Sequence, residues 1–157
     1  MTTRTCTRCR AQTEPARLDT AAGRSDPVAF CLHDMPVLAC PNGHRQFIEP
    51  GFALKLVEQL VKEDEAGLPA GKEKGLIFTH YYCGACGAEL GKDAERRETF
   101  PLDVSLPDYH PFRVEVTAPV YRCPKCSREQ LHSLEQVRKA TPPALAEAFR
   151  AADIPPG

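Results

Sequence analysis

Apolar residues follow a helical period in the first half of the chain. Phe52, Leu56 and Leu60 recur every four residues, and further apolar side chains widen the same stripe. This spacing is typical of an amphipathic helix that packs on a core, and it predicts a helix over residues 51–65. Glycine and proline follow soon afterwards, so we expect residues 68–75 to form a linker.

A strand period appears in the second half. Apolar and polar residues alternate over residues 112–117, and again over residues 100–104. Alternation directs every second side chain of a strand to the core, so the two segments predict an antiparallel hairpin. Residues 76–82 are rich in aromatic and β-branched side chains and predict a further strand.

Two helix start signals lie near the C-terminus. Ser133 is followed three residues later by Gln136, which is the pattern of a capping box. Thr141 precedes two prolines, and proline is favoured in the first turn of a helix. We therefore expect two short helices, over residues 133–140 and 142–152.

Seven of the eight cysteines and one histidine fall into four short ligand pairs, which we call knuckles. Two knuckles together supply the four soft or borderline ligands that a tetrahedral zinc ion requires. The sequence therefore predicts two zinc ions and two ligand sets. The first set is Cys6, Cys9, Cys40 and His44, and the second set is Cys83, Cys86, Cys123 and Cys126.

Alternatives remain at both sets. Cys31 or His33 could replace His44 as the fourth ligand of the first set, although Cys31 lies between two apolar residues and is more typical of a small buried side chain. Free thiols or a redox pair are the competing interpretation of the paired cysteines. His80, His110 and His132 have no partner at ligand spacing, so we expect them to be ordinary strand or loop histidines.

The two sites are expected to be structural. Four protein ligands leave no position for substrate or water, and the chain has no zinc-hydrolase or zinc-deaminase signature, so we expect no enzyme. Zinc binding to small finger peptides is worth about 10–16 kcal/mol, whereas whole domains are stable by about 5–15 kcal/mol. We therefore expect each half of the chain to depend on its ion for folding.

The same order of features occurs twice along the chain. Residues 36–41 and 119–124 both follow the pattern Pro-Val-x-x-Cys-Pro and lead into the second knuckle of their set. Phe30 lies six residues before the first Pro-Val, and Phe112 lies seven before the second. This similarity suggests an internal duplication.

The predicted fold class is a small, metal-dominated α+β protein with two zinc-ribbon-like β units, each followed by helix. The first unit covers residues 1–67 and the second covers residues 76–157. Fifteen prolines and no tryptophan in 157 residues predict many loops and modest cores.

Charge and hydropathy narrow the class of partner. The chain has no signal-peptide pattern and no apolar run of about 18 residues, so we expect a cytoplasmic protein with no membrane contact. The formal net charge of −1 becomes about −4 when both sites hold zinc, because bound cysteines are thiolates. An acidic protein is poorly suited to binding the phosphate backbone of a nucleic acid. Arg4, Arg8 and Arg10 form one small basic cluster near the first knuckle.

The first half resembles the zinc-finger domain of MqsA-type antitoxins. The similarity covers Cys6 to His44, and again Cys83 to Cys126, and consists of a CxxC knuckle, a long β insertion, a Pro-Val strand and a second ligand pair. That family has Cys-x-x-Cys at the second knuckle, from which Cys40-x3-His44 departs. The resemblance implies a zinc-stabilised protein-binding module; the helices that would form the family's DNA-binding half do not follow the finger here.

The second half also resembles rubredoxin. Residues 83–87 and 123–126 are similar to its two knuckles, which implies one iron in four thiolates and an electron-carrying role. Here 36 residues separate the knuckles, and Ser127 stands where a second glycine would be expected.

These observations lead to one functional expectation and two alternatives. We expect two structural zinc sites that support a protein–protein interaction or regulatory module, with an unidentified protein as partner. A nucleic-acid-binding zinc ribbon and a rubredoxin-like iron electron carrier, with iron at the second site, are the alternatives.

Overall fold

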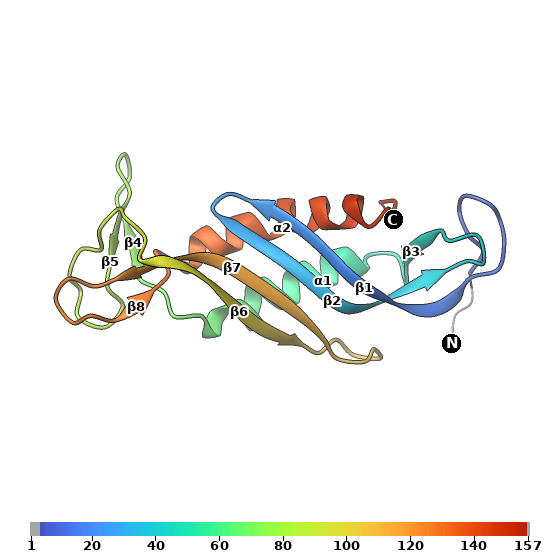
Figure 1. Ribbon diagram of the computed structural model, residues 1–157, viewed down its shortest axis with the longest axis horizontal. Coiled ribbons are helices and arrows are strands. Elements are labelled where there is room, and N and C mark those ends of the chain that lie inside the picture. Colours follow the sequence, from blue (N-terminus) through green and yellow to red (C-terminus); the bar gives the residue numbers. More distant parts are fainter. Residues whose placement is uncertain (1–3, 157) are drawn as a thin grey trace.

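The computed structural model describes residues 4–156 as an elongated α+β molecule, in which one long sheet carries two helices on one face (Figure 1). The central sheet has the strand order β1-β2-β7-β6. Its strands are β1 (Glu14–Ser25), β2 (Val28–Ala39), β6 (Arg96–Val104) and β7 (Phe112–Arg122). The short strands are β3 (Arg45–Phe47), β4 (Lys72–Lys74), β5 (His80–Tyr82) and β8 (Glu129–Gln130), and the helices are α1 (Phe52–Lys62), the 3₁₀ turn η1 (Asp64–Gly67) and α2 (Leu134–Ala151).

The two halves of the chain share this sheet. β1 and β2 form one antiparallel hairpin. β6 and β7 form the hairpin that the alternating pattern predicted, with Leu102 opposite Val114. The hairpins join through β2 and β7, which pair antiparallel at five positions centred on Cys31 opposite Glu115. The knuckles of the first half and those of the second half therefore lie at opposite ends of the molecule (Figure 1).

The distance in sequence from the phenylalanine to the Pro-Val pair is one residue shorter in the first half than in the second, and this difference has a local cause. In β7, every second residue from Phe112 to Val120 is buried without interruption. In β2, the same alternation runs to Leu32 and resumes one position out of phase at Met35. Asp34 lies between them with a φ of 66°, in the left-handed region that aspartate tolerates better than most residues. The shift of phase at Asp34 accounts for the shorter spacing after Phe30.

The helix predicted over residues 51–65 is confirmed as α1, followed by η1. Phe52, Leu56 and Leu60 are fully buried, as their period predicted. Residues 68–75, which were expected to form a linker, include β4, and Gly71 N–H donates to the Leu131 carbonyl at 2.9 Å.

The expectation of two helices at the C-terminus is wrong, because α2 runs without a break through Pro142 and Pro143. Ser133 is the N-cap as predicted and accepts the Gln136 N–H at 3.2 Å. The prolines remove two N–H donors but keep a φ that suits a helix. Burial of α2 against β1 and β2 maintains the helix across this point. Tertiary packing thus overrides the local stop signal.

The hydrophobic core is larger than the composition suggested. Buried side chains from both hairpins, α1 and α2 form one continuous cluster that spans the middle of the molecule. It does not include the knuckle cysteines of either end; Cys83 and Cys123 belong to a small separate cluster with Leu90. The central sheet therefore has a source of stability that is independent of the knuckles.

α2 approaches β1 closely at Gly23. A side-chain carbon at this position would overlap the Ala144 carbonyl oxygen and lie within 2.6 Å of the Ala148 nitrogen. Glycine is required here because the helix backbone occupies the space that any other residue would need.

Strand structure over residues 76–82 is limited to β5 at their C-terminal end. Leu76, Ile77 and Phe78 instead form the tip of the hairpin between β4 and β5, which projects from one end of the molecule (Figure 1). Within residues 4–156, no helix combines the length and the apolar character needed to cross a bilayer.

Candidate metal centres

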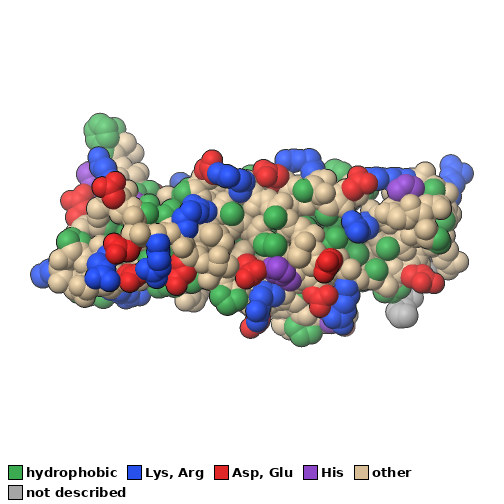
Figure 2. Space-filling model, in the orientation of Figure 1, with side chains coloured by type: hydrophobic (Ala, Val, Ile, Leu, Met, Phe, Trp, Pro, Cys, Tyr) green, Lys and Arg blue, Asp and Glu red, His purple; other side chains and the backbone are tan. Residues whose placement is uncertain are grey.

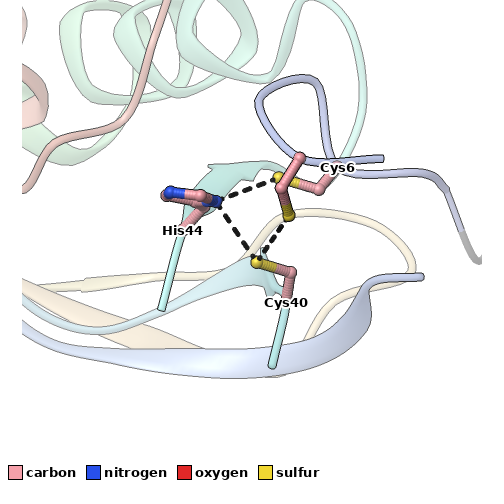
Figure 3. A group of neighbouring side chains, drawn as sticks. Cys6, Cys40 and His44 are labelled. Carbon is pink, nitrogen blue, oxygen red and sulfur yellow. Dashed lines mark hydrogen bonds between the residues drawn. The ribbon is translucent and has the colours of Figure 1, made fainter. Parts of the chain in front are cut away.

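The first ligand set comes together at the N-terminal end of the sheet. Cys6 and Cys9 lie in the loop before β1, and Cys40 and His44 flank the turn between β2 and β3. The sulfurs of Cys9 and Cys40 are 3.7 Å apart. His44 Nδ1 lies 3.6 Å from Cys6 Sγ and 3.5 Å from Cys40 Sγ, so that the side chains converge on one point (Figure 3).

The second ligand set comes together at the other end. Cys83 and Cys86 follow β5, and Cys123 and Cys126 flank the turn between β7 and β8. The sulfurs of Cys83 and Cys126 are 3.6 Å apart, and those of Cys86 and Cys123 are 3.5 Å apart. In each of the two sets, all four ligand atoms lie within 4.8 Å of one another.

These separations fit a tetrahedral ion. With metal–sulfur bonds of about 2.3 Å and metal–nitrogen bonds of about 2.0–2.1 Å, a tetrahedral site places sulfurs about 3.8 Å apart and sulfur and nitrogen about 3.6 Å apart. The measured distances lie close to these values. A disulfide would need sulfurs at about 2.05 Å, and all eight cysteines are free. Both sets can therefore hold a metal ion with four protein ligands.

The three CxxC knuckles share one backbone arrangement. In each, the residue after the second cysteine donates its N–H to the carbonyl of the first cysteine, at 2.9–3.0 Å. That residue has a left-handed backbone in every case: Arg10 (φ 63°), Gly87 (φ 79°) and Ser127 (φ 66°). Ser127 thus adopts the conformation for which a glycine was expected, and Arg10 does the same without any sign in the sequence.

Backbone N–H groups also point at the sulfurs. The first cysteine of each CxxC knuckle accepts an N–H from the residue two positions later, at 3.5 Å in Cys6, 3.4 Å in Cys83 and 3.4 Å in Cys123. Such bonds favour the thiolate over the thiol, which is the form that binds metal.

Two glutamines that the sequence analysis did not single out hold the knuckles. Gln46 in β3 accepts the Thr7 N–H at 3.2 Å, and Gln130 in β8 accepts the Gly84 N–H at 2.8 Å. Both amide oxygens thus bind the residue after the first cysteine of their site. Gln130 also donates to Cys83 Sγ at 3.2 Å. A glutamine soon after each second knuckle was the only sequence signal for this role.

The acidity of two thiols follows from these contacts. The pKa of Cys83 is lowered to about 5, first by the Cys86 N–H and then by the amide of Gln130. The pKa of Cys9 is lowered to about 6, first by the side-chain amide of Asn42, which donates to its sulfur at 3.3 Å. Each site therefore offers at least one ligand in its metal-binding form near neutral pH.

Cys31 and His33 do not join the first set. They lie in the middle of β2, where Cys31 faces Glu115 across the strand pair and His33 binds Glu115. The structure brings His44, rather than either of these residues, to Cys6, Cys9 and Cys40.

The remaining histidines have structural contacts. His80 Nδ1 lies 2.8 Å from Glu89 Oε1, and His110 Nε2 lies 2.7 Å from the Asp34 carbonyl. His132 is stacked between Tyr81 and Tyr121, with ring centroids 4.1 Å and 3.4 Å away. Burial lowers the pKa of His132, which favours the neutral ring.

Two arginines of the N-terminal basic cluster bind within the protein. Arg4 donates to the Ile48 carbonyl at 2.7 Å, and Arg8 forms a bidentate pair with the Asp153 carboxylate at 2.6 and 2.8 Å. These contacts join the N-terminal segment to the residues that follow β3 and α2, so they favour a structural role for both side chains.

Comparison of the chain with protein-family models, with curated proteins and with solved structures finds no match. The similarity to MqsA-type zinc fingers and to rubredoxin therefore stays a prediction from the spacing and types of the ligands.

Proposed function

We propose that the chain is a zinc-binding protein in which two structural zinc sites support a protein–protein interaction module. The observation that carries the proposal is the hairpin between β4 and β5. Its tip exposes three large apolar side chains in succession: Leu76 is 106% exposed, Ile77 is 87% exposed and Phe78 is 77% exposed. The tip projects from one end of the molecule and forms a distinct apolar spot on its surface (Figure 2).

The tip has a defined shape. Gly75 has a φ of 118°, and a side-chain carbon there would overlap the Phe78 carbonyl oxygen, so the turn requires glycine. At its base, Lys74 lies over the Tyr82 ring, 5.3 Å from the centroid. β5 then leads directly into Cys83, so a metal ion at the second site would hold the hairpin in place.

Apolar side chains that protrude singly are common, but three adjacent ones on a shaped turn favour a contact site. Each such side chain gains about 1.5–3 kcal/mol when it is fully buried. A pocket in a protein partner could therefore gain several kcal/mol from this tip alone. The role of the metal in this proposal is to fix the geometry of the hairpin; with four protein ligands, neither site offers a position for catalysis.

The test has a metal arm and a binding arm. Elemental analysis of the reduced, purified protein is expected to find two zinc ions per chain, and fewer than one would contradict the proposal. Iron at the second site is the alternative, since four thiolates accept either metal, and it would colour the protein.

For the binding arm, the wild type and a variant with Leu76, Ile77 and Phe78 all changed to serine would each be used as bait in cells of the source organism. Quantitative mass spectrometry is expected to find a protein that the wild type retains and the variant loses. Leu54→Ser is the matched control, because Leu54 is 63% exposed on α1, away from the hairpin. Equal retention by the wild type and the tip variant would overturn this role for the hairpin.

A further inference from the structure

The seam between β2 and β7 carries a cluster of metal-binding side chains that belongs to neither knuckle set. Cys31 and His33 are two residues apart on β2 and project from the same face of the strand. Glu115 projects from β7 directly opposite Cys31 and diagonally from His33. Phe30 and Leu32, which alternate with them, are buried on the core side, so the cluster lies on the face that the helices leave open.

The geometry of the cluster suits one ion. Cys31 Sγ, a ring nitrogen of His33 and a carboxylate oxygen of Glu115 all lie within 4.8 Å of one another. His33 Nε2 binds Glu115 Oε1 directly, so an ion at this position would take the place of that hydrogen bond. The side chains of His33 and Glu115 are 35% and 33% exposed, so an ion from solvent can reach their donor atoms. Thiolate, imidazole and carboxylate are the three ligand types that zinc uses in proteins.

The surface beside the cluster is hollowed. His33, Glu115, Arg113 and Asp103 line a depression of about 480 Å³ on this face. Figure 2 shows acidic, basic and histidine side chains together near the middle of the molecule. A hydrogen bond between His33 and Glu115 would form on an exposed sheet without a neighbouring thiol or a depression. Because Cys31 lies beside the pair and a depression adjoins it, the arrangement suggests that an ion binds here.

We propose that Cys31, His33 and Glu115 form a third metal site, which binds an ion of the zinc class with three protein ligands and a fourth position open to the depression. Binding releases the thiol proton, and the ion then takes the thiolate, the neutral imidazole and the carboxylate. The site differs from the first and second ligand sets, which we call the tetrads because each has four protein ligands. Three protein ligands leave room for water or a small anion on the ion.

The position of the site gives it a consequence for the whole fold. β2 belongs to the first half of the chain and β7 to the second, and the ion would connect them at the centre of their five paired positions. An ion bound by three partly exposed ligands exchanges more readily than one enclosed by four. The site would therefore respond to the concentration of available metal, while the tetrads stay filled.

The test uses the one thiol that lies outside both tetrads. Protein with its tetrads filled by zinc is treated with iodoacetamide, with and without further zinc, and Cys31 alkylation is followed by mass spectrometry. We expect added zinc to slow Cys31 alkylation at least tenfold. In parallel, a calorimetric zinc titration of the same protein is expected to show one further binding event per chain.

Variants identify the ligands. Cys31→Ser is expected to abolish the further binding event, and Glu115→Gln to weaken it at least tenfold, because it removes the anionic ligand but keeps the size of the side chain. Glu98→Gln on β6 is the control, since Glu98 is similarly exposed and lies outside the cluster. Amide exchange spectra would verify that each variant keeps the fold.

Three outcomes would overturn the third site. One is equal alkylation of Cys31 with and without added zinc. Another is the absence of a further binding event in the wild type. The last is an event that Cys31→Ser or Glu115→Gln leaves unchanged, because the ion would then be bound elsewhere. None of these results bears on the hairpin tip, so failure here is distinguishable from failure of the proposed interaction role.

Discussion

The side chain of Gln130, which lies in β8 after the Cys123–Cys126 knuckle, binds the other knuckle of the second site at Cys83. Its amide nitrogen donates to Cys83 Sγ at 3.2 Å, while its amide oxygen accepts the Gly84 N–H at 2.8 Å. Gln130 is fully buried, so neither bond competes with water. Gln46 has the corresponding position at the first site, where its oxygen accepts the Thr7 N–H.

Replacing this glutamine should weaken metal binding. Gln130→Leu keeps the volume of the side chain but removes both hydrogen bonds, and loss of a side chain that hydrogen-bonds a metal ligand typically costs about 10–100-fold in metal affinity. Competition with a chromophoric chelator would measure the effect at each site. Gln46→Leu is the matched control, and we expect it to weaken the first site and leave the second unchanged. Unchanged zinc affinity in Gln130→Leu would contradict this account.

Gly23→Ala should destabilise the protein. The added methyl group would meet the Ala144 and Ala148 backbone, which cannot move as an exposed side chain could. Overpacking of this kind costs about 1–3 kcal/mol. Urea denaturation would measure it, with Ala22→Ser on the exposed side of the same strand as the control, for which we expect little change. A stability equal to the wild type would show that α2 can shift away from β1.

Glu65 should make stability depend on pH. This side chain is fully buried, one carboxyl oxygen contacts Thr141 Oγ1 at 2.6 Å, and the other has no hydrogen-bond partner. Burial raises its pKa, while Thr141 and Arg138 lower it and Asp64 raises it further. The unfolded carboxyl ionises above about pH 4.3 while the folded one keeps its proton. Its contribution to stability is therefore complete below that pH and is lost as the pH rises through the folded pKa.

Glu65→Gln removes this titration while keeping the size of the side chain. We expect the variant to gain stability relative to the wild type as the pH rises from 4 to 8. Protonation of the metal ligands affects both proteins equally, so the difference between their urea midpoints isolates residue 65. Glu63→Gln, on an exposed side chain nearby, is the control for replacing a carboxylate with an amide. A difference for Glu65→Gln that does not change with pH would show that folding leaves the pKa of this carboxyl at its unfolded value.

Removal of metal should loosen the ends of the molecule before its middle. The knuckles and the short strands β3, β4, β5 and β8 lie at the two ends, whereas the continuous core lies under the central sheet. After chelation, we expect amide hydrogens of the knuckles to exchange rapidly and those at the β2–β7 pairing to remain protected. Hydrogen exchange with mass spectrometry would measure both. Equal loss of protection along the whole chain would show that each half needs its ion to fold, as the ligand pattern alone suggested.

The local pattern of the sequence was sufficient to predict the metal-ligand turns, helix α1 and one hairpin. The spacing of Cys83 and Cys86 indicates a metal-binding turn because two sulfurs two residues apart can reach one ion without help from the rest of the fold. The period of Phe52, Leu56 and Leu60 indicates α1 for a similar reason, since a helix places residues four apart on one face. The hairpin over residues 100–117 also depended only on alternation within a short stretch.

Tertiary structure decided the features that depend on residues far apart in the chain. Pairing of β2 with β7 places Cys31 beside Glu115, 84 positions later, and no local period could have predicted that contact. α2 continues through Pro142 because one face of the helix is buried against β1 and β2. The free energy gained by this burial exceeds the cost of the hydrogen bonds that the prolines cannot donate. Periodicity in the sequence describes which side of an element faces the core. Long-range contacts determine which other element packs on that side. The pairing of β2 with β7 at the centre of this protein consists of such long-range contacts.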